Sequence, residues 1–311
     1  MNRRPLSQRA TSRAIDLALS SLSAAARVHP HARLGGVRLV RDVPYLPTGD
    51  GAHLLDVYQP EGPARGAVLY VHGGGFRILS KDTHWMMALA FARRGYVVFS
   101  INYRLAPAHV YPAPLIDVLA AWSFVARHAS RFGADPARLV LAGESAGANL
   151  VTAAACAHAF ARLEPFAAVA PALPVSAVVP LCGILDVTRP ERFHALARTS
   201  PWVQQRIELV CHGYAPHACP GDLASPLSIL ESDAEPARPL PPFAASAGDA
   251  DPIVDDTRRL DAALAKRGVA RRVTVHPGEA HAFQALFWRE EAKRAWEGCF
   301  SFLEEHVVAR A

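Results

Sequence analysis

Short apolar runs alternate with longer amphipathic stretches along the chain. The runs are rich in Val, Leu and Tyr and predict strands, whereas the stretches with a helical period predict helices. The strands are expected near 37–46, 53–59, 66–72, 96–102, 138–142, 175–182, 242–247 and 271–276. The helices are expected near 83–94, 113–132, 146–162, 253–267 and 285–308. This order indicates an α/β protein with a mainly parallel, eight-stranded sheet wrapped by helices.

Two regions depart from this alternation. The first two strands are joined by the turn-forming segment 47–51, which predicts an antiparallel hairpin at the sheet edge. Residues 187–238 contain prolines, aromatic residues and three histidines but no clean strand, so they predict a small helical insertion over the sheet. Such an insertion is well placed to act as a lid that excludes water and shapes a pocket.

The N-terminal segment is basic, and we interpret it as an amphipathic helix that docks on the body of the protein. No compact apolar stretch with a small-residue cleavage site precedes the helix, which argues against an export signal. Together with the insertion, this helix is expected to cover the site. The apolar positions fall on one helical stripe, formed by Ile15, Leu17, Leu19, Leu22 and Ala26.

Composition narrows the classes of function. The 311 residues carry a net charge of +5, but Lys and Arg are spread along the chain, so we expect no nucleic-acid partner. The longest apolar stretch, 166–185, contains three prolines and is expected to form a loop and a buried strand rather than a membrane span.

The five cysteines form no C-x-x-C pair, which argues against a structural zinc site or a disulfide framework. We expect free buried thiols and a cytoplasmic location, with a local bridge between Cys211 and Cys219 as the alternative.

The segment 141–147 reads Leu-Ala-Gly-Glu-Ser-Ala-Gly and follows an apolar run directly. A serine between two glycines, placed after a strand and before helix-forming residues, predicts a nucleophile elbow. The small neighbours Gly143 and Gly147 allow strand and helix to approach closely, and the strained turn exposes the serine hydroxyl. Ser145 is therefore the candidate nucleophile.

The segment 72–76 reads His-Gly-Gly-Gly-Phe and follows another predicted strand. Glycines can turn backbone N–H groups toward a negative oxygen, so Gly73, Gly74 and Gly75 are candidate oxyanion-hole donors. Ala146 is the further candidate, because its N–H begins the helix after the nucleophile. His72 is poorly placed to be the base, and we expect it to brace the loop by hydrogen bonding.

An activated serine needs a histidine base held by a carboxylate. The expected chain order is serine, acid, histidine, which leaves His276, His281 and His306 as candidate bases. His281 is preferred because it lies in a polar loop after the last predicted strand, from which a side chain can reach the carboxyl edge of the sheet.

The acid is expected on the loop after the preceding strand, where Asp249 and Asp251 compete. Asp251 is preferred because the ring of Pro252 keeps it extended and out of the following helix. Asp249 and Asp255 are expected to brace the loop or cap the helix.

These motifs resemble those of the hormone-sensitive-lipase-type esterases of the α/β-hydrolase superfamily. The resemblance covers nearly the whole chain. It includes the two glycine motifs and also Tyr103-Arg104-Leu105-Ala106-Pro107, Pro112, Asp117, Ser225-Pro226-Leu227, Asp251-Pro252 and His281-x-Phe283. Two positions depart from the family pattern, because Glu144 stands where many members carry Asp or Thr, and Ala108 where an acid often follows.

The resemblance implies the α/β-hydrolase fold with a helical cap. It implies a catalytic triad of Ser145, Asp251 and His281, oxyanion donors at Gly74, Gly75 and Ala146, and a structural role for Arg104. The implied organisation is an N-terminal cap segment at 1–45, a core at 46–186 and 239–311, and a cap insertion at 187–238. Homodimers, which family members often form through the last strand and helix, are also an expectation.

The function we predict is hydrolysis of small carboxylic esters, with short- to medium-chain acyl groups, through an acyl-enzyme intermediate on Ser145. The reaction requires no metal or organic cofactor, and we expect a neutral to alkaline optimum. One alternative uses the same triad on an amide, such as an N-formyl or N-acyl arylamine. The other is a ligand receptor on the same scaffold, since fold does not fix function.

Overall fold

The structure is a computed structural model that describes residues 35–161, 174–193 and 200–309. The predicted N-terminal helix and the first part of the apolar stretch 166–185 lie outside these ranges. An eight-stranded sheet has the order β1-β2-β4-β3-β5-β6-β7-β8. The strands are β1 (Val37–Pro44), β2 (Leu54–Pro60), β3 (Gly66–Val71), β4 (Tyr96–Ile101), β5 (Leu139–Glu144), β6 (Ala177–Leu181), β7 (Phe243–Gly248) and β8 (Arg271–His276).

The sheet is mainly parallel, as predicted. β2 runs antiparallel to both β1 and β4, and every other neighbouring pair is parallel. The hairpin predicted at the sheet edge is confirmed, because β1 and β2 are the first two strands in the order. All eight predicted strands are present, with ends that differ from the predicted ones by at most two residues.

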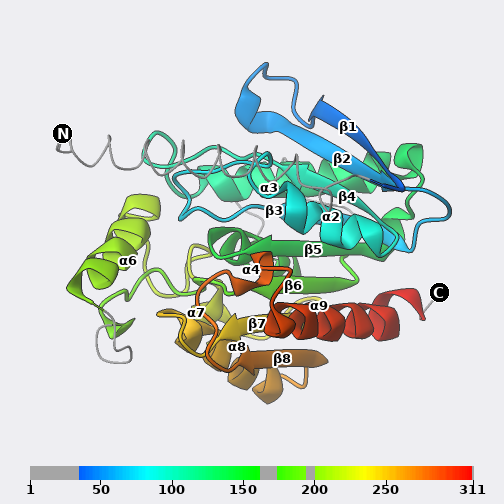
Figure 1. Cartoon of the computed structure of the whole chain (residues 1–311). Coiled ribbons are helices and arrows are strands. Elements are labelled where there is room, and N and C mark those ends of the chain that lie inside the picture. The colour runs from blue at the N-terminus through cyan, green and yellow to red at the C-terminus, as the bar shows by residue number, and fades with distance from the viewer. Residues whose placement is uncertain (1–34, 162–173, 194–199, 310–311) are drawn as a thin grey trace.

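From β3 onward, helices connect the strands, as Figure 1 shows. Two predicted helices were too long by at least four residues. The one expected at 113–132 ends at His128, and a short 3₁₀ turn follows that is closed by Gly133 in the left-handed region. The one expected from 285 begins at Glu290. The helices are α2 (Trp85–Arg93), α3 (Ala113–His128), α4 (Ala146–Ala159), α6 (Pro201–Tyr214), α7 (Pro226–Glu231), α8 (Val254–Lys266) and α9 (Glu290–Leu303).

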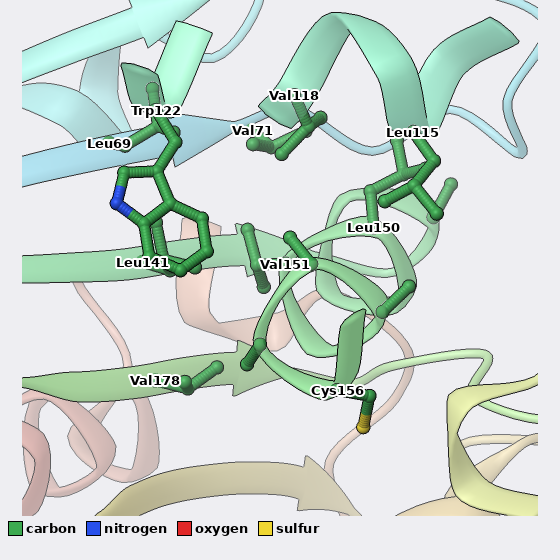
Figure 2. Close-up of a cluster of buried hydrophobic side chains, with 14 of the residues drawn as sticks. Leu69, Val71, Leu115, Val118, Trp122, Leu141, Leu150, Val151, Cys156 and Val178 are labelled. Atoms are coloured by element: carbon green, nitrogen blue, oxygen red, sulfur yellow. The ribbon is translucent and has the colours of Figure 1, made fainter. Parts of the chain in front are cut away.

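The helices cover both faces of the sheet and bury its central strands. α3, α4 and α8 pack on one face, and α2 and α9 pack on the other. Every residue of β3, β4 and β5 is buried. Figure 2 shows Trp122 of α3 and Val151 of α4 against Leu69, Leu141 and Val178 of the strands. Each such side chain stabilises the fold by about 1.5–3 kcal/mol, so the central strands form a rigid platform.

The predicted insertion contributes two helices among its described residues, α6 and α7. α6 lies beyond one end of the strands in Figure 1. The ring of Tyr214, its last residue, stacks on Phe76 with a centroid separation of 3.6 Å, and the Tyr214 carbonyl accepts a hydrogen bond from Tyr111 N–H. Val210 lies against Gly75, where an added Cβ would be 2.8 Å from a Val210 methyl group. α6 is therefore fastened to the glycine loop after β3.

Charged side chains anchor the start of this insertion. Asp186 and Asp256 are fully buried, and Arg192 forms ion pairs with both. Arg189 and Arg259 also pair with Asp186, at 2.8 and 3.2 Å. Buried carboxylates are tolerated only when partners satisfy them, so this network fixes the point where the chain leaves the sheet.

The cysteines correct one expectation. All five are free, so Cys211 and Cys219 are not bridged. Four are buried as predicted, but Cys219 is exposed, because it lies in the turn-rich segment between α6 and α7. Among the residues that the structure describes, no helix combines the length and the apolar character needed to cross a membrane.

Candidate active site

The turn between β5 and α4 has the strained geometry predicted from the glycine-flanked serine. Ser145 has φ 54° and ψ −109°, a conformation that non-glycine residues rarely adopt. A Cβ at Gly143 would lie 2.5 Å from the backbone of Gly147, and a Cβ at Gly147 would lie 2.0 Å from the Val71 carbonyl oxygen. Both glycines are therefore needed for strand and helix to meet, and their close packing holds Ser145 in its turn.

The structure brings the three predicted triad residues together. His281 Nε2 lies 3.0 Å from Ser145 Oγ, and His281 Nδ1 lies 2.8 Å from Asp251 Oδ2. Because a carboxylate can only accept, Nδ1 carries the hydrogen, and in the neutral ring Nε2 accepts from the serine hydroxyl. These contacts have the geometry of a nucleophile, a general base and an orienting acid.

Close loop packing at the carboxyl edge of the sheet aligns acid and base. Asp251 is 2% exposed, and its second oxygen accepts the Ile253 N–H at 3.0 Å. The competing Asp249 instead accepts the Gly278 N–H at 2.7 Å, which is the loop-bracing role expected for it. A Cβ at Gly248 would lie 1.8 Å from the Glu279 carbonyl oxygen, so glycine permits the approach of the two loops.

The other two candidate bases lie elsewhere. His276 ends β8, is 4% exposed and pairs with Glu291 of α9 at 2.9 Å. His306 lies in the π-helical turn Glu304–Val308 at the end of α9, with its ring 4.2 Å from that of Phe302. Neither contacts Ser145, so His281 is the base that the geometry favours.

The pKa of His281 is shifted upward. Partial removal of the ring from water opposes its charged form, but the charge and hydrogen bond of Asp251, with a further contribution from Glu144, raise the pKa from 6.5 to about 9. The side chain is 35% exposed, and solvent therefore screens part of this attraction. The protonated ring is stabilised, as a base that must accept a proton requires.

The glycine loop presents two of its predicted donors in unusual conformations. Gly74 and Gly75 have φ values of +105° and +58°, and a Cβ at Gly74 would lie 2.2 Å from the Ile78 carbonyl oxygen. At position 74 only glycine avoids both the strained φ and this clash. The loop can therefore turn its N–H groups toward the site. The N–H of Ala146 begins α4, where helix N–H groups lack an intrahelical acceptor.

Gly73 lies in different surroundings from the other two glycines of the loop. Its N–H lies 3.3 Å from His84 Nε2, the nitrogen that also contacts Glu144. An added Cβ at Gly73 would lie 2.9 Å from one carboxylate oxygen of Glu144 and 3.0 Å from the other. Space for this buried side chain is one physical reason for glycine at position 73.

His72 is placed to brace the loop, as expected. Its Nδ1 contacts the Gly73 carbonyl oxygen at 2.7 Å, and its ring stacks on Tyr103 with centroids 4.4 Å apart. The Tyr103 hydroxyl donates to the His72 carbonyl at 3.0 Å. Burial and the neighbouring His84 lower the pKa of His72 to about 3, so the ring is neutral and does not carry a proton to substrate.

Arg104 holds loops together, as the resemblance implied. Its guanidinium binds both oxygens of the fully buried Asp117 at 2.7–3.0 Å and donates to the Ala113 carbonyl. His53 also contacts Asp117, at 3.2 Å. Arg104 thus ties the segment after β4 to α3, Asp117 links α3 to His53 between β1 and β2, and Arg104 makes no contact with the triad.

Sequence reasoning missed three residues beside the triad: Glu144, His84 and Cys182. Glu144 Oε2 lies 3.0 Å from His84 Nε2, and Glu144 Oε1 lies 4.0 Å from both His281 Nε2 and Cys182 Sγ. Glu144 adjoins the nucleophile in the sequence, which offered a signal. His84 and Cys182 belong to segments without any motif, so only the fold brings them here.

Glu144, Cys182 and His281 form one group of potential metal ligands in the described part of the chain, with ligand atoms within 4.8 Å of one another. Burial and the nearby carboxylates raise the pKa of Cys182 well above its usual range, which keeps the thiol neutral. His281 Nε2 already contacts Ser145, so a metal ion bound here would compete with the nucleophile for its base.

The sheet, the elbow and the histidine–carboxylate pair together define an α/β protein with a serine-hydrolase arrangement of side chains. A family model described as alpha/beta hydrolase fold matches residues 68–285, well over half of the chain. The chain therefore belongs to the α/β-hydrolase fold family, and the predicted fold class is confirmed.

Known relatives sharpen this placement. Esterase LipI of Mycobacterium tuberculosis is 33% identical over 271 residues, which cover 83% of this chain and 75% of LipI. Esterase LipQ of the same organism is 30% identical over 262 residues, covering 82% of this chain but only 59% of LipQ. The chain thus spans little more than half of LipQ.

A solved structure of an esterase from the bacterial hormone-sensitive lipase family superimposes with a TM-score of 0.72. It is 25% identical, and the match covers 99% of this chain and 93% of that one. The resemblance to hormone-sensitive-lipase-type esterases is confirmed by these relatives.

Proposed function

We propose that this protein hydrolyses carboxylic esters through an acyl-enzyme intermediate on Ser145. The observation that carries the proposal is the continuous hydrogen-bonded chain from Asp251 through His281 to Ser145, with contacts of 2.8 and 3.0 Å. The relatives described above are named esterases, which supports ester rather than amide substrates.

The reaction begins when His281 Nε2 takes the proton from Ser145 Oγ as this oxygen attacks the ester carbonyl carbon. The carbonyl π bond breaks and leaves a negative oxygen, to which Gly74, Gly75 and Ala146 donate N–H hydrogen bonds. Each such donor contributes about 3–4 kcal/mol to stabilising the intermediate, or about 100- to 1000-fold in rate. His281 then gives the proton to the departing alcohol oxygen.

Water completes the cycle on the same groups. His281 removes a proton from water, the resulting oxygen attacks the acyl carbon, and Ser145 leaves with the proton returned by His281. Asp251 remains ionised throughout, orients the ring through Nδ1 and stabilises the imidazolium. Every proton that moves is accounted for by Ser145, His281, water and substrate.

The cap insertion is proposed to cover the acyl group. α6 touches the glycine loop through Val210 and Tyr214, so its position limits the space beside the oxyanion donors. A bound acyl chain would lie near this helix, and we propose a preference for short to medium chains.

The test is a panel of nitrophenyl esters of increasing acyl length, assayed with the wild type and with Ser145→Ala. We expect turnover of the shorter esters by the wild type and a loss on the order of 10⁶-fold in kcat for the variant. Ser130→Ala is the matched control, because Ser130 is an exposed serine of the 3₁₀ turn Ala129–Phe132. Retention of more than a small fraction of the rate by Ser145→Ala would disprove the assignment of the nucleophile.

A matched aryl ester and aryl amide distinguish the substrate classes. We expect the ester to be hydrolysed much faster, since an amine leaves only when the imidazolium is well placed to protonate it. Comparable rates on both would favour amide hydrolysis. Tight binding of a small molecule without any turnover would favour the alternative that the protein is a ligand receptor.

We further propose that the enzyme acts in the cytoplasm and forms a homodimer. All five cysteines are free, which supports a cytoplasmic location because disulfides are rare in a reducing compartment. β8 is the last strand in the sheet order, and such an edge offers unpaired backbone groups to a second copy. Light scattering of the purified protein tests the dimer, and a monomer at micromolar concentration would contradict it.

A further inference from the structure

Glu144 is a buried acid whose side chain turns into the site. It is the last residue of β5 and directly precedes Ser145. The residue is 8% exposed, and its carboxylate packs against the Cα of Gly73, where an added Cβ would lie 2.9–3.0 Å from both oxygens. A carboxylate removed from water to this degree is costly unless specific partners compensate for its lost hydration.

His84 is that partner. Its Nε2 lies 3.0 Å from Glu144 Oε2, and its Nδ1 contacts the Thr83 hydroxyl at 3.0 Å and the Ser80 carbonyl at 3.3 Å. Burial disfavours the ionised form of Glu144, but the hydrogen bond and charge of His84 outweigh it and lower the pKa of Glu144. The carboxylate is therefore charged and fixed in direction by a ring that is itself anchored at both nitrogens.

The second oxygen of this carboxylate faces the base. Glu144 Oε1 lies 4.0 Å from His281 Nε2, the nitrogen that receives the serine proton, whereas Asp251 contacts Nδ1 on the other side of the ring. The protonated ring is thus placed between two carboxylates. Asp251 is hydrogen-bonded to it, and Glu144 acts on it by charge across a gap that leaves Nε2 free for Ser145 and the leaving group.

The remaining titratable groups around Glu144 are neutral at physiological pH. Burial is the main cause that raises the pKa of each, and the Glu144 charge raises it further. The negative charges acting on His281 are therefore those of Asp251 and Glu144. The neutral groups come from β3, the segment after β4 and the segment after β6, and they are Tyr70, Tyr103 and Cys182.

We propose that Glu144, held by His84, is a positioning residue that stabilises protonated His281 and thereby sets the pH range in which the enzyme is active. This inference rests on the proposed serine-esterase mechanism. When the Ser145 O–H bond breaks and the N–H bond forms at Nε2, the new positive charge develops 4.0 Å from the carboxylate. The same attraction acts in the free enzyme, where it holds the ring protonated to higher pH.

Replacement of Glu144 by glutamine tests this role, because the amide keeps the shape and removes the charge. We expect the acid limb of the kcat/KM profile to move to lower pH by about 0.7 unit or more, since even the dielectric of bulk water leaves an attraction of that size at 4 Å. At the alkaline plateau we expect kcat to fall by about fivefold, because the imidazolium of the intermediate loses the same attraction.

Two further variants separate charge from structure. Glu291→Gln removes a carboxylate that pairs with His276 rather than with the base, and it should leave the acid limb in place. Glu144→Asp keeps the charge, so the acid limb of its kcat/KM profile should stay close to that of the wild type. A space-filling role would not make the position of the acid limb depend on the charge. Melting temperatures of all variants show whether each one is folded.

An NMR titration of His281, assigned with His281→Gln, gives a readout that does not need turnover. We expect the midpoint to fall in Glu144→Gln and to remain unchanged in Glu291→Gln. An unchanged midpoint in folded Glu144→Gln would overturn the inference, even if the esterase mechanism holds. If the wild type hydrolysed no ester, the proposed function would be wrong. The titration would still report whether Glu144 acts on the His281 ring.

Discussion

Two histidine–carboxylate pairs flank the turn after β8, and they differ in what their second nitrogen faces. His276 Nδ1 contacts Glu291 at 2.9 Å, and His281 Nδ1 contacts Asp251 at 2.8 Å. His276 is buried and its Nε2 has no hydrogen-bond partner in the described structure, whereas His281 Nε2 lies 3.0 Å from Ser145 Oγ. A histidine held by a carboxylate is therefore not enough for a base, because the free nitrogen must also meet the nucleophile.

Backbone position explains the difference. His276 is part of the β7–β8 ladder, paired with Gly248, and its side-chain direction is fixed by the pleat. That direction takes the ring to Glu291 on α9. His281 lies beyond the strand in a loop, so its side chain can cross the carboxyl edge of the sheet. The comparison shows that a residue at a strand end has its side-chain direction fixed by the sheet. A residue in the following loop can place its side chain next to the nucleophile.

The largest effect is expected when His281 loses its basic nitrogen. We expect His281→Gln to lower kcat on a short nitrophenyl ester on the order of 10⁶-fold, because serine attack then has no proton acceptor. Steady-state kinetics with burst-phase titration of active sites provides the measurement. The matched variant His276→Gln should keep kcat within about twofold per folded molecule while its melting temperature falls.

If both histidine variants lost activity to the same degree, the contrast between the pairs would be wrong. Circular dichroism of each variant separates such a result from unfolding.

The next effect concerns the acids. Asp251→Asn should lower kcat by about 10⁴-fold, because the amide favours the wrong ring tautomer and no longer stabilises the imidazolium. Glu291→Gln should leave kcat unchanged, since its partner His276 does not touch the nucleophile. Kinetics at the alkaline plateau tests both, and a rate for Asp251→Asn close to that of the wild type would shift the acid role to another carboxylate.

The pH dependence follows from the raised pKa of His281, about 9. Only the neutral ring can accept the serine proton, so kcat/KM should rise about tenfold per pH unit below this value and level off above it. His276→Gln should reproduce the same profile. An acid limb centred near pH 5 would show that the carboxylates do not stabilise the protonated ring in solution.

The smallest effect is on stability. The folded pKa of His281 lies above its ordinary value of 6.5, so folding favours the protonated ring. This contribution is fully present below pH 6.5 and is lost as the pH rises through about 9. We expect the free energy of unfolding of the wild type relative to His281→Gln to fall across this window in urea titrations. A difference that stays constant would contradict the linkage.

The local sequence predicted parts of the site in which the chemistry and the backbone geometry require particular residue types. A serine in this strained turn requires glycine on both sides. Gly143 and Gly147 therefore identify Ser145 as the candidate nucleophile from the sequence alone. The preference for Asp251 over Asp249 came from the following proline, and the observed contacts agree with it. These predictions agree with the observed geometry because their physical causes act within a few residues along the chain.

Contacts were not predicted where their cause is non-local. The missing Cβ of Gly73 makes room for Glu144, and the Gly73 N–H faces His84, which lies in another segment. Cys182 lies in a segment that carries no motif, yet the register of β5 and β6 brings it next to the site. No pattern in the sequence reports such neighbours.

The sequence by itself determined the order of strands and helices, the nucleophile elbow and the residue types of the triad. These depend on periodicity, glycine sterics and the chemistry of activating a hydroxyl group, all of which act over short stretches of chain. Only the tertiary structure decided that His276 turns to Glu291, how Glu144 and His84 pair behind Ser145, and where α6 touches the glycine loop. Those contacts join segments far apart in the chain, and packing of the whole sheet fixes their distances.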